Sequence, residues 1–455
     1  MKHFIAYSLV ITLVIGACSK KKDPQPDKPP VDSTGKDSTR KDVRDSVYFV
    51  AKELYLWADK LPSAVTFKPT SYDSAEAVML KVRTYSPLGT NGKNLDRWSF
   101  AMKKSVYDKV SSGISGDFGV SFGWAPGTAN DLRIASVYKN SDAGVKGVTR
   151  GWKVVSMNGV AATSANVAAL NTALQGSSID FAFQKPDGTQ QTLTIKRTEY
   201  QINPVLTRKI IEQNGKKIGY VAFETFFSTT AEAALKEAFS YFKTNGVTEL
   251  IFDERYNGGG YVSVAERAAN WIVPQSAAGK LMYKDSHNSA YASWNKTKNF
   301  DTALPAENLN LSRVFFIATG NSASASELLI NVLTPYLTVK IIGNTTYGKP
   351  AGYYPIPVMN YYSLPLAVKQ VNANNYGDYY EGLKADRTQV DGVTYDWGDP
   401  KEPCVADALA FIANGSFPAA SGGRLAAEQE SAPKVQAETP FRGAVLAAPK
   451  GIRLK

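Results

Sequence analysis

Apolar residues first recur at helical spacing between residues 42 and 112. Side chains three or four positions apart share one face of a helix, so this spacing predicts helices that pack into a small helical domain. Asp73-Ser74 is a start signal for the second of these helices. The apolar positions that carry the pattern are Val47, Val50, Leu54, Trp57, Ala77, Met79, Val82 and Tyr85.

The pattern changes between residues 113 and 200 to short runs rich in β-branched and aromatic residues. Turn signals such as Asn158-Gly159 and Asp187-Gly188 separate the runs, and one helical stretch covers residues 164–174. This pattern predicts a small, partly open β-barrel. The predicted strands cover residues 118–122, 132–137, 153–157, 179–184 and 191–197.

Strands and helices alternate between residues 201 and 417. Strands separated by helices of this length imply βαβ units and a mostly parallel sheet, whose ligands bind beyond the carboxyl ends of the strands. The predicted strands cover residues 218–223, 249–253, 314–319 and 339–343, and the predicted helices cover residues 230–245, 262–271, 327–337 and 405–413.

Residues 1–17 have the layout of a secretory signal peptide, in which Lys2 precedes an apolar run that is too short to span a bilayer stably. Residues 15–18 resemble the bacterial lipobox, which implies that Cys18 is lipidated and anchors an exported cell-envelope lipoprotein to a membrane. The alternative is a chance cysteine beside an ordinary cleavage site. Residues 18–41 read as a disordered linker, and residues 418–455 as a low-complexity tail that is disordered or forms a loosely docked helix.

The composition is that of an ordinary globular protein, since 44% of the 455 residues are hydrophobic. The net charge of +11 is spread over the chain without a basic stripe, so nucleic acid is not an expected partner. Only two cysteines occur. If Cys18 carries lipid, Cys404 has no intramolecular partner and is expected to be a small buried residue.

A run of three glycines closes the strand at 249–253 and opens the following helix. It belongs to residues 253–260, which read DERYNGGG. Because Gly258, Gly259 and Gly260 lack side chains, their N–H groups can approach a bound atom closely, so the run is a candidate anion or oxyanion site. The alternative is a flexible turn.

A serine-rich turn, residues 321–327 (NSASASE), joins the strand at 314–319 to a helix. A serine at such a tight turn exposes its hydroxyl, and the next amide, here that of Ala325, can join an oxyanion hole. Ser324 is therefore a candidate nucleophile. Alternatively, Ser324 forms a capping box with Glu327, which needs no catalysis.

A serine nucleophile needs a base. Of the two histidines, His3 lies in the predicted signal peptide and His287 lies in a polar stretch that predicts an exposed loop. Lysine becomes a base when burial lowers its pKa towards about 7. Lys349, in a Gly-Lys-Pro turn after the last predicted strand, is the best candidate, although such a turn on its own is usually a solvated loop.

Together these motifs resemble those of the carboxy-terminal processing, or tail-specific, serine peptidases, over about residues 110–412. The resemblance implies an α/β multi-domain fold with a ClpP/crotonase-like peptidase core. It implies that Ser324 is the nucleophile and Lys349 the general base, with an oxyanion hole made by the amides of Ala325 and of Gly259 or a neighbour. It also implies cleavage of exported polypeptides without a metal or organic cofactor.

Within the β-rich region, Phe118-Gly119-Val120 and residues 141–144 and 151–159 resemble a PDZ domain. In that family a glycine-containing loop offers N–H groups to the terminal carboxylate of a peptide, which adds to the sheet as a strand. Phe118, Gly119 and Val120 are therefore candidate peptide-binding residues, and polypeptides with exposed C-termini are the expected partners.

Two positions depart from the peptidase pattern. A glutamine commonly follows the lysine by four residues, where this chain has Tyr353, and an apolar residue commonly follows the motif's aspartate, where it has Glu254. The group that orients Lys349 is then unidentified. The second hypothesis is a catalytically silent, PDZ-bearing lipoprotein that binds peptides.

Overall fold

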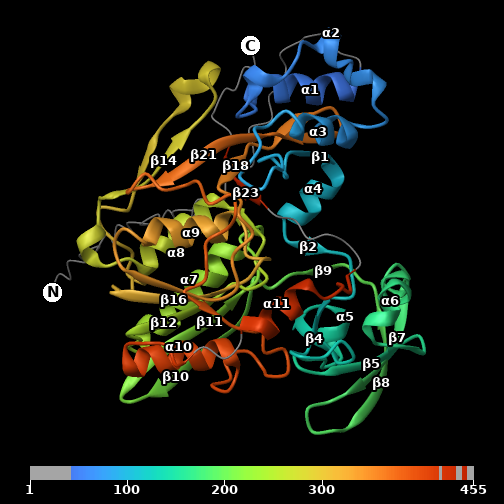
Figure 1. Ribbon diagram of the computed structural model, residues 1–455. Helices are drawn as coiled ribbons and strands as arrows, with labels where there is room; N and C mark the ends of the chain where they lie inside the picture. The colour runs from blue at the N-terminus through green and yellow to red at the C-terminus, as the bar shows by residue number, and fades with distance from the viewer. Residues whose placement is uncertain (1–41, 420–422, 437–442, 448–455) are drawn as a thin grey trace, which may run out of the picture.

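The computed structural model describes residues 42–419, 423–436 and 443–447. The predicted signal peptide, Cys18 and the predicted linker lie outside the described residues. Within the described ranges, no helix combines the length and the apolar character that crossing a membrane requires. Figure 1 shows a helical N-terminal part and a β-rich module at different sides of an α/β core.

The N-terminal part is helical, as its apolar spacing predicts, but it shares a sheet with distant residues. Its helices are α1 (Val43–Leu54), α2 (Ala64–Phe67), α3 (Ala75–Arg83) and α4 (Lys104–Ser111), and its sheet joins β1 (Phe100–Lys103), β20 (Tyr361–Leu364) and β19 (Ile356–Val358). Asp42 and Ser74 cap α1 and α3 by accepting backbone N–H groups. The buried side chains of α1 and α3 pack with those of β20, so these helices do not form a core of their own.

The β-rich module is a six-stranded antiparallel sheet with two short helices. Its elements are β3 (Val120–Trp124), β4 (Leu132–Val137), β5 (Lys153–Met157), β6 (Val160–Ala161), β7 (Ser178–Gln184), β8 (Gln190–Lys196), α5 (Asp142–Val145) and α6 (Val167–Ala173). The chain enters and leaves the module side by side, because β2 (Ile114–Ser115) pairs with β9 (Tyr200–Gln201). The predicted strands are confirmed to within two residues, and alternate residues of β7 are buried as period-two patterning requires.

The α/β core is built on a six-stranded sheet, parallel except at one edge. The strand order is β10 (Val205–Gln213), β11 (Lys216–Phe223), β12 (Glu249–Asp253), β16 (Arg313–Ala318), β17 (Thr338–Gly343) and β22 (Arg387–Thr388). One face packs on α7 (Ala231–Thr244), α8 (Val262–Ile272) and α9 (Ala325–Leu333), and the other on α10 (Pro403–Asn414). The predicted βαβ alternation is therefore confirmed.

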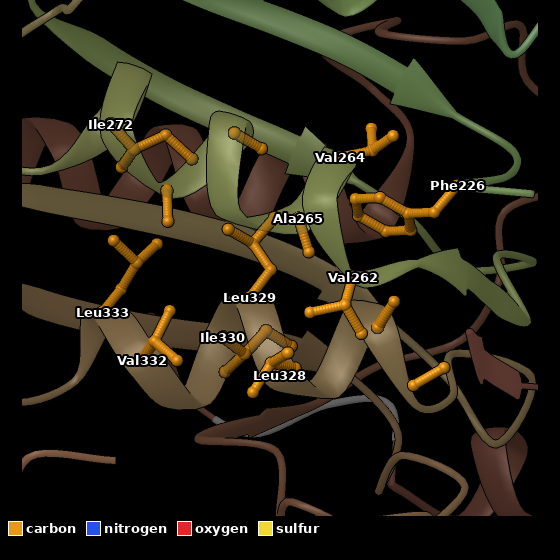
Figure 2. Packing of buried hydrophobic residues seen from close by; sticks show 14 of the residues in the cluster. Phe226, Val262, Val264, Ala265, Ile272, Leu328, Leu329, Ile330, Val332 and Leu333 are labelled. Carbon is orange, nitrogen blue, oxygen red and sulfur yellow. The ribbon is translucent and has the colours of Figure 1, made fainter. Parts of the chain in front are cut away.

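Each residue of helix α9 is buried, including the polar residues Ser326, Glu327 and Asn331. Figure 2 shows its leucine, isoleucine and valine side chains in one layer with those of α8. A helix that is buried on all sides has no free face on which to shift. Its N-terminus, which follows Ser324, is therefore held in a fixed place.

A second six-stranded sheet covers this helix layer. Its order is β13 (Gly259–Tyr261), β23 (Gly443–Val445), β18 (Ala351–Tyr353), β21 (Leu366–Asn372), β14 (Leu281–Ser286) and β15 (Thr297–Asn299). Short 3₁₀ turns cover residues Ala58–Lys60, Pro69–Ser71, Ser164–Asn166, Gln275–Ala277 and Ser289–Trp294.

The described part of the C-terminal segment contains a helix, which was one of the two expected alternatives, and also a strand that was not expected. In the described part of this segment, α11 (Gly423–Ser431) lies between the core and the module (Figure 1), and β23 pairs with both β13 and β18. A three-residue strand shows too little periodicity to be predicted from sequence. In addition, the strands that pair with β23 are nearly a hundred or more residues away along the chain.

Candidate functional site

Ser324 lies at a strained turn between β16 and α9. Its φ is 63°, in the left-handed region, which costs a residue other than glycine about 1–3 kcal/mol. Neighbouring hydrogen bonds hold the turn in place: Ser322 Oγ donates to Glu254 O (2.7 Å) and Ser326 Oγ donates to Asn257 O (3.0 Å). The other serines of the motif thus attach the Ser324 turn to the segment that leads into the glycine run.

Lys349 faces Ser324. Its Nζ lies 3.4 Å from Ser324 Oγ, and each of the two residues is 1% exposed. Burial lowers the pKa of Lys349 well below its usual range, although the charges of Asp96 and Glu327 oppose this shift. The structure therefore brings a serine hydroxyl and an amine that favours its neutral form into contact.

Tyr353 supplies a contact for Lys349 at the position where the family pattern has glutamine. The Lys349 amine lies 3.5 Å from the centre of the Tyr353 ring, and Tyr353 OH donates to Trp98 O (2.8 Å). Ring and hydroxyl are therefore both held. The sequence gives no signal for this contact, because the substitution of an aromatic ring for an amide indicates no particular geometry.

Glu327 joins the serine turn to the lysine turn. Its carboxylate accepts the backbone N–H groups of Ser324 (2.7 Å), Gly348 (2.6 Å) and Lys349 (2.8 Å), and the hydroxyl of Thr346 (2.5 Å). Burial raises its pKa, and these hydrogen bonds oppose that shift. Ser324 is the N-cap residue of α9. It therefore caps this helix and also contacts Lys349 through its Oγ, so the two interpretations of the serine are compatible.

The glycine run passes directly beside the serine turn. A Cβ on Gly259, whose φ is 99°, would lie 2.7 Å from Ala323 O and 3.0 Å from Ala325 N, so only glycine fits there. Gly259 N–H donates to the Asn257 side chain (2.9 Å). The sequence predicts that Gly259 or a neighbour donates its amide to the oxyanion. Because the Gly259 N–H already has a partner, the amides of Gly258 and Gly260 are the remaining candidates in the glycine run.

The two acidic residues of the DERYNGGG motif lie in different surroundings. Asp253 pairs with Arg255 (2.8 Å). Glu254 is fully buried, and neither of its carboxylate oxygens has a hydrogen-bond partner. Burial and the nearby charge of Glu327 raise the pKa of Glu254 well above its usual range, which favours the neutral form of this carboxyl.

A buried ion network connects this motif to the β-rich module. Arg150 of the module donates to Asp391 (2.6 Å), and Arg255 donates to Asp391 (2.7 Å) and Glu402 (2.9 Å). Burial alone would raise the pKa of Asp391, but the two arginines lower it to about 2. Nothing in the sequence indicates this network, because Arg150 and Asp391 are 241 residues apart.

The remaining candidates lie elsewhere. Phe118 is buried in the module, Val120 begins β3, and Gly119 N–H donates to Asp117 Oδ1 (2.6 Å). His287 is half-buried between Tyr354 and Asn295, which corrects the expected exposed loop. Cys404 is buried as expected. In the part of the chain that the structure describes, no three His, Cys, Asp or Glu side chains gather closely enough to hold a metal ion.

Comparison with known proteins gives this arrangement a context. The model of Peptidase family S41 matches residues 217–389, a stretch that contains both Ser324 and Lys349. Carboxy-terminal processing protease CtpB of Bacillus subtilis is 28% identical over 272 residues, which cover 58% of this chain and 53% of that protein. A Staphylococcus saprophyticus protein named "Probable CtpA-like serine protease" is 24% identical over 257 residues, which cover 56% and 49%.

The chain thus spans about half the length of the curated relatives it matches. A crystal structure of a Bacteroides fragilis protein assigned to the S41 proteases superimposes with a TM-score of 0.66 at 24% identity, covering 82% of this chain and 97% of that one. This likeness shows that the multi-domain α/β fold is shared. The family match and the curated relatives together show that the part of the chain that holds Ser324 and Lys349 is similar to peptidase family S41.

Proposed function

We propose that the chain is a serine endopeptidase of the carboxy-terminal processing type, with Ser324 as nucleophile and Lys349 as general base. The observation that carries this proposal is the 3.4 Å contact between Lys349 Nζ and Ser324 Oγ in a buried site. Catalytic hydrogen bonds of resting enzymes are often long and shorten when substrate binds. The silent-lipoprotein alternative offers no reason to bury an amine against a strained serine.

The proposed reaction begins with neutral Lys349, which accepts the proton of Ser324 as Oγ attacks a peptide carbonyl. The resulting oxyanion accepts hydrogen bonds from the amide of Ala325 and from one in the glycine run, Gly258 or Gly260. Each such donor contributes about 3–4 kcal/mol in comparable sites. The Lys349 ammonium then protonates the leaving amine, and water hydrolyses the acyl-enzyme with Lys349 again as base.

The β-rich module is proposed to act as a PDZ-like domain inserted into a ClpP/crotonase-like core. Phe118, Gly119 and Val120 would receive the C-terminus of a polypeptide substrate, which adds beside β3. The order of strands and the helix α6 beside them support this assignment. The proposal includes export and membrane anchoring through lipidated Cys18, so the substrates would be exported polypeptides of the cell envelope.

Hydrolysis of an unfolded polypeptide such as reduced casein tests the proposal. Ser324→Ala and Lys349→Ala are each expected to lower kcat by at least about a thousandfold, because nucleophile and base act as one unit. Ser289→Ala and Lys340→Ala, which change a serine and a lysine outside the site, are the matched controls and should retain the wild-type rate. Wild-type hydrolysis by either site variant would refute the assignment.

A further inference from the structure

The C-terminal segment lies first against the β-rich module. After α11, Trp124 Nε1 of β3 donates to Pro433 O (2.7 Å), and Asn171 of α6 donates to Lys434 O (3.2 Å) and accepts from Gln436 N–H (2.9 Å). Val435 is 6% exposed and joins the core of the module. Residues 432–436 thus bind where the end of β3 and helix α6 present side chains to a passing backbone.

These contacts are of the kind that a peptide ligand makes. The Asn171 side chain binds both a carbonyl and an N–H group of the segment, and Trp124 binds a second carbonyl. Backbone hydrogen bonds of this kind supply affinity for an extended peptide, while a single buried side chain, here Val435, supplies selectivity. The segment therefore occupies the module as an extended peptide would.

The same segment then lies between the two strands that flank the dyad. In β23, Gly443 N–H donates to Gly258 O (3.0 Å), and Leu446 N–H donates to Tyr353 O (3.0 Å). One neighbour, β13, belongs to the glycine run, and the other, β18, carries the ring beneath Lys349. Ala444, Val445 and Leu446 are all at most 6% exposed.

The carbonyl of Gly443 lies beside the candidate oxyanion donors. A Cβ on Gly259 would be 2.8 Å from Gly443 O and 3.0 Å from Ala325 N, so these two groups border the same small space. Ser324 and Lys349 are each only 1% exposed in this conformation. A polypeptide from another molecule therefore has little access to the dyad while β23 is in place.

We propose that residues 432–436 and 443–447 are a built-in peptide ligand, which fills the substrate path of its own chain and must leave before a substrate enters. This inference rests on the proposed function. The inference also indicates which class of sequence can bind between β13 and β18: an extended run of small apolar residues followed by leucine. Gly352 makes room for that leucine, because a Cβ there would lie 2.5 Å from Leu446 Cδ1.

Peptide binding to the full chain tests the inference without requiring hydrolysis. The probe is a fluorescein-labelled synthetic peptide with the sequence of residues 432–447, measured by anisotropy in a Ser324→Ala background. Val445→Asp places a charge in the buried strand, and Gly443→Pro removes the N–H that binds Gly258 O. Each is expected to bind the probe at least about tenfold more tightly than the background alone, because the competing segment is released.

Arg424→Ala is the matched control, because Arg424 lies on the exposed side of α11 and its side chain is 82% exposed. It should leave probe binding unchanged. If Val445→Asp and Gly443→Pro both lower the melting temperature and neither binds the probe more tightly, β23 is a permanent structural strand and the inference is wrong. Equal binding by all variants would overturn it as well.

Hydrolysis by the same variants with Ser324 intact separates this inference from the proposed function. The Val445→Asp and Gly443→Pro chains, in which the C-terminal segment is expected to be released, should cleave casein faster than the wild type. Tighter probe binding without hydrolysis by any variant would sustain the built-in ligand and reject the peptidase. Wild-type hydrolysis, with neither faster cleavage nor tighter binding after release, would sustain the peptidase and reject the built-in ligand.

Discussion

The amine of Lys349 lies in a site that disfavours its charged form. Burial lowers its pKa, so between that lowered value and about 10.4 the unfolded chain binds one more proton than the folded chain at this residue. The free energy of unfolding therefore rises with pH across this window. Below the folded-state pKa the amine is an ammonium and cannot accept the proton of Ser324, so activity should fall as the pH drops through that value.

Replacing Lys349 with methionine is therefore expected to stabilise the fold. Lys349→Met should raise the melting temperature at pH 7, and the gain over wild type should shrink as the pH approaches about 10.4. Thermal unfolding at several pH values measures this difference. Lys340→Met is the control, because that amine is partly exposed and pairs with Asp386 (2.8 Å). A gain that does not change with pH would contradict the account.

At the residue scale the sequence identifies the two residues proposed to react but not the side chains that hold them. Ser324 and Lys349 can be selected from the sequence, because a serine in a strand-to-helix turn and a lysine in a turn after the next strand are the residue types that a nucleophile and its base require. The roles of Glu327 and Tyr353 become visible only when the two turns, more than twenty residues apart, are side by side. A carboxylate that accepts three backbone N–H groups leaves no mark in the sequence beyond a common capping pattern.

At the element scale, the contact between the module and the core depends on one buried arginine. Arg150 bonds Asp391 and the backbone of Ala135 and Tyr395, and it stacks on Trp397 at 4.2 Å. Removing Arg150 would leave Asp391 with Arg255 as its partner but would take the donor away from the carbonyls of Ala135 and Tyr395. Breaking a buried ion pair typically costs about 3–5 kcal/mol. Arg150 therefore helps to hold the module beside the DERYNGGG segment, where it also contacts Tyr256.

Arg150→Ala is accordingly expected to lower the urea midpoint by an amount that corresponds to about 3–5 kcal/mol, as followed by tryptophan fluorescence. Arg208→Ala is the matched control: Arg208 pairs with Glu237, which is 68% exposed, so its loss should cost less than about 1 kcal/mol. Equal midpoints for the two variants would show that the Arg150 network does not support the module.

Several helices and strands of the core were predictable from their local pattern, whereas very short strands with distant partners were not. The helices α7, α8 and α10 and the strands β12 and β16 follow clear periodic patterns and lie within two residues of their predicted bounds. By contrast, β1 and β23 consist of four and three residues and are stabilised by partners far along the chain. Their formation is decided by tertiary pairing rather than local preference.

At the scale of the whole molecule, three distant parts of the chain meet at the dyad. The N-terminal part contributes Trp98 O, which holds Tyr353, the core contributes Ser324 and Lys349, and the C-terminal segment contributes β23. The same C-terminal segment also contacts the module through Trp124 and Asn171. The C-terminal segment therefore contacts both the module and the strands beside the dyad.

The central claim is that Lys349 activates Ser324. Labelling with a fluorophosphonate, followed by peptide mass spectrometry, tests it most directly. It should be done on the wild-type and Val445→Asp chains, so that the C-terminal segment cannot hide the serine. The account predicts one adduct on Ser324, formed at least about a hundredfold more slowly in Lys349→Ala and at an unchanged rate in Lys340→Ala. Labelling of Ser324 at the same rate without Lys349, or no labelling of Ser324 in either chain, would contradict it.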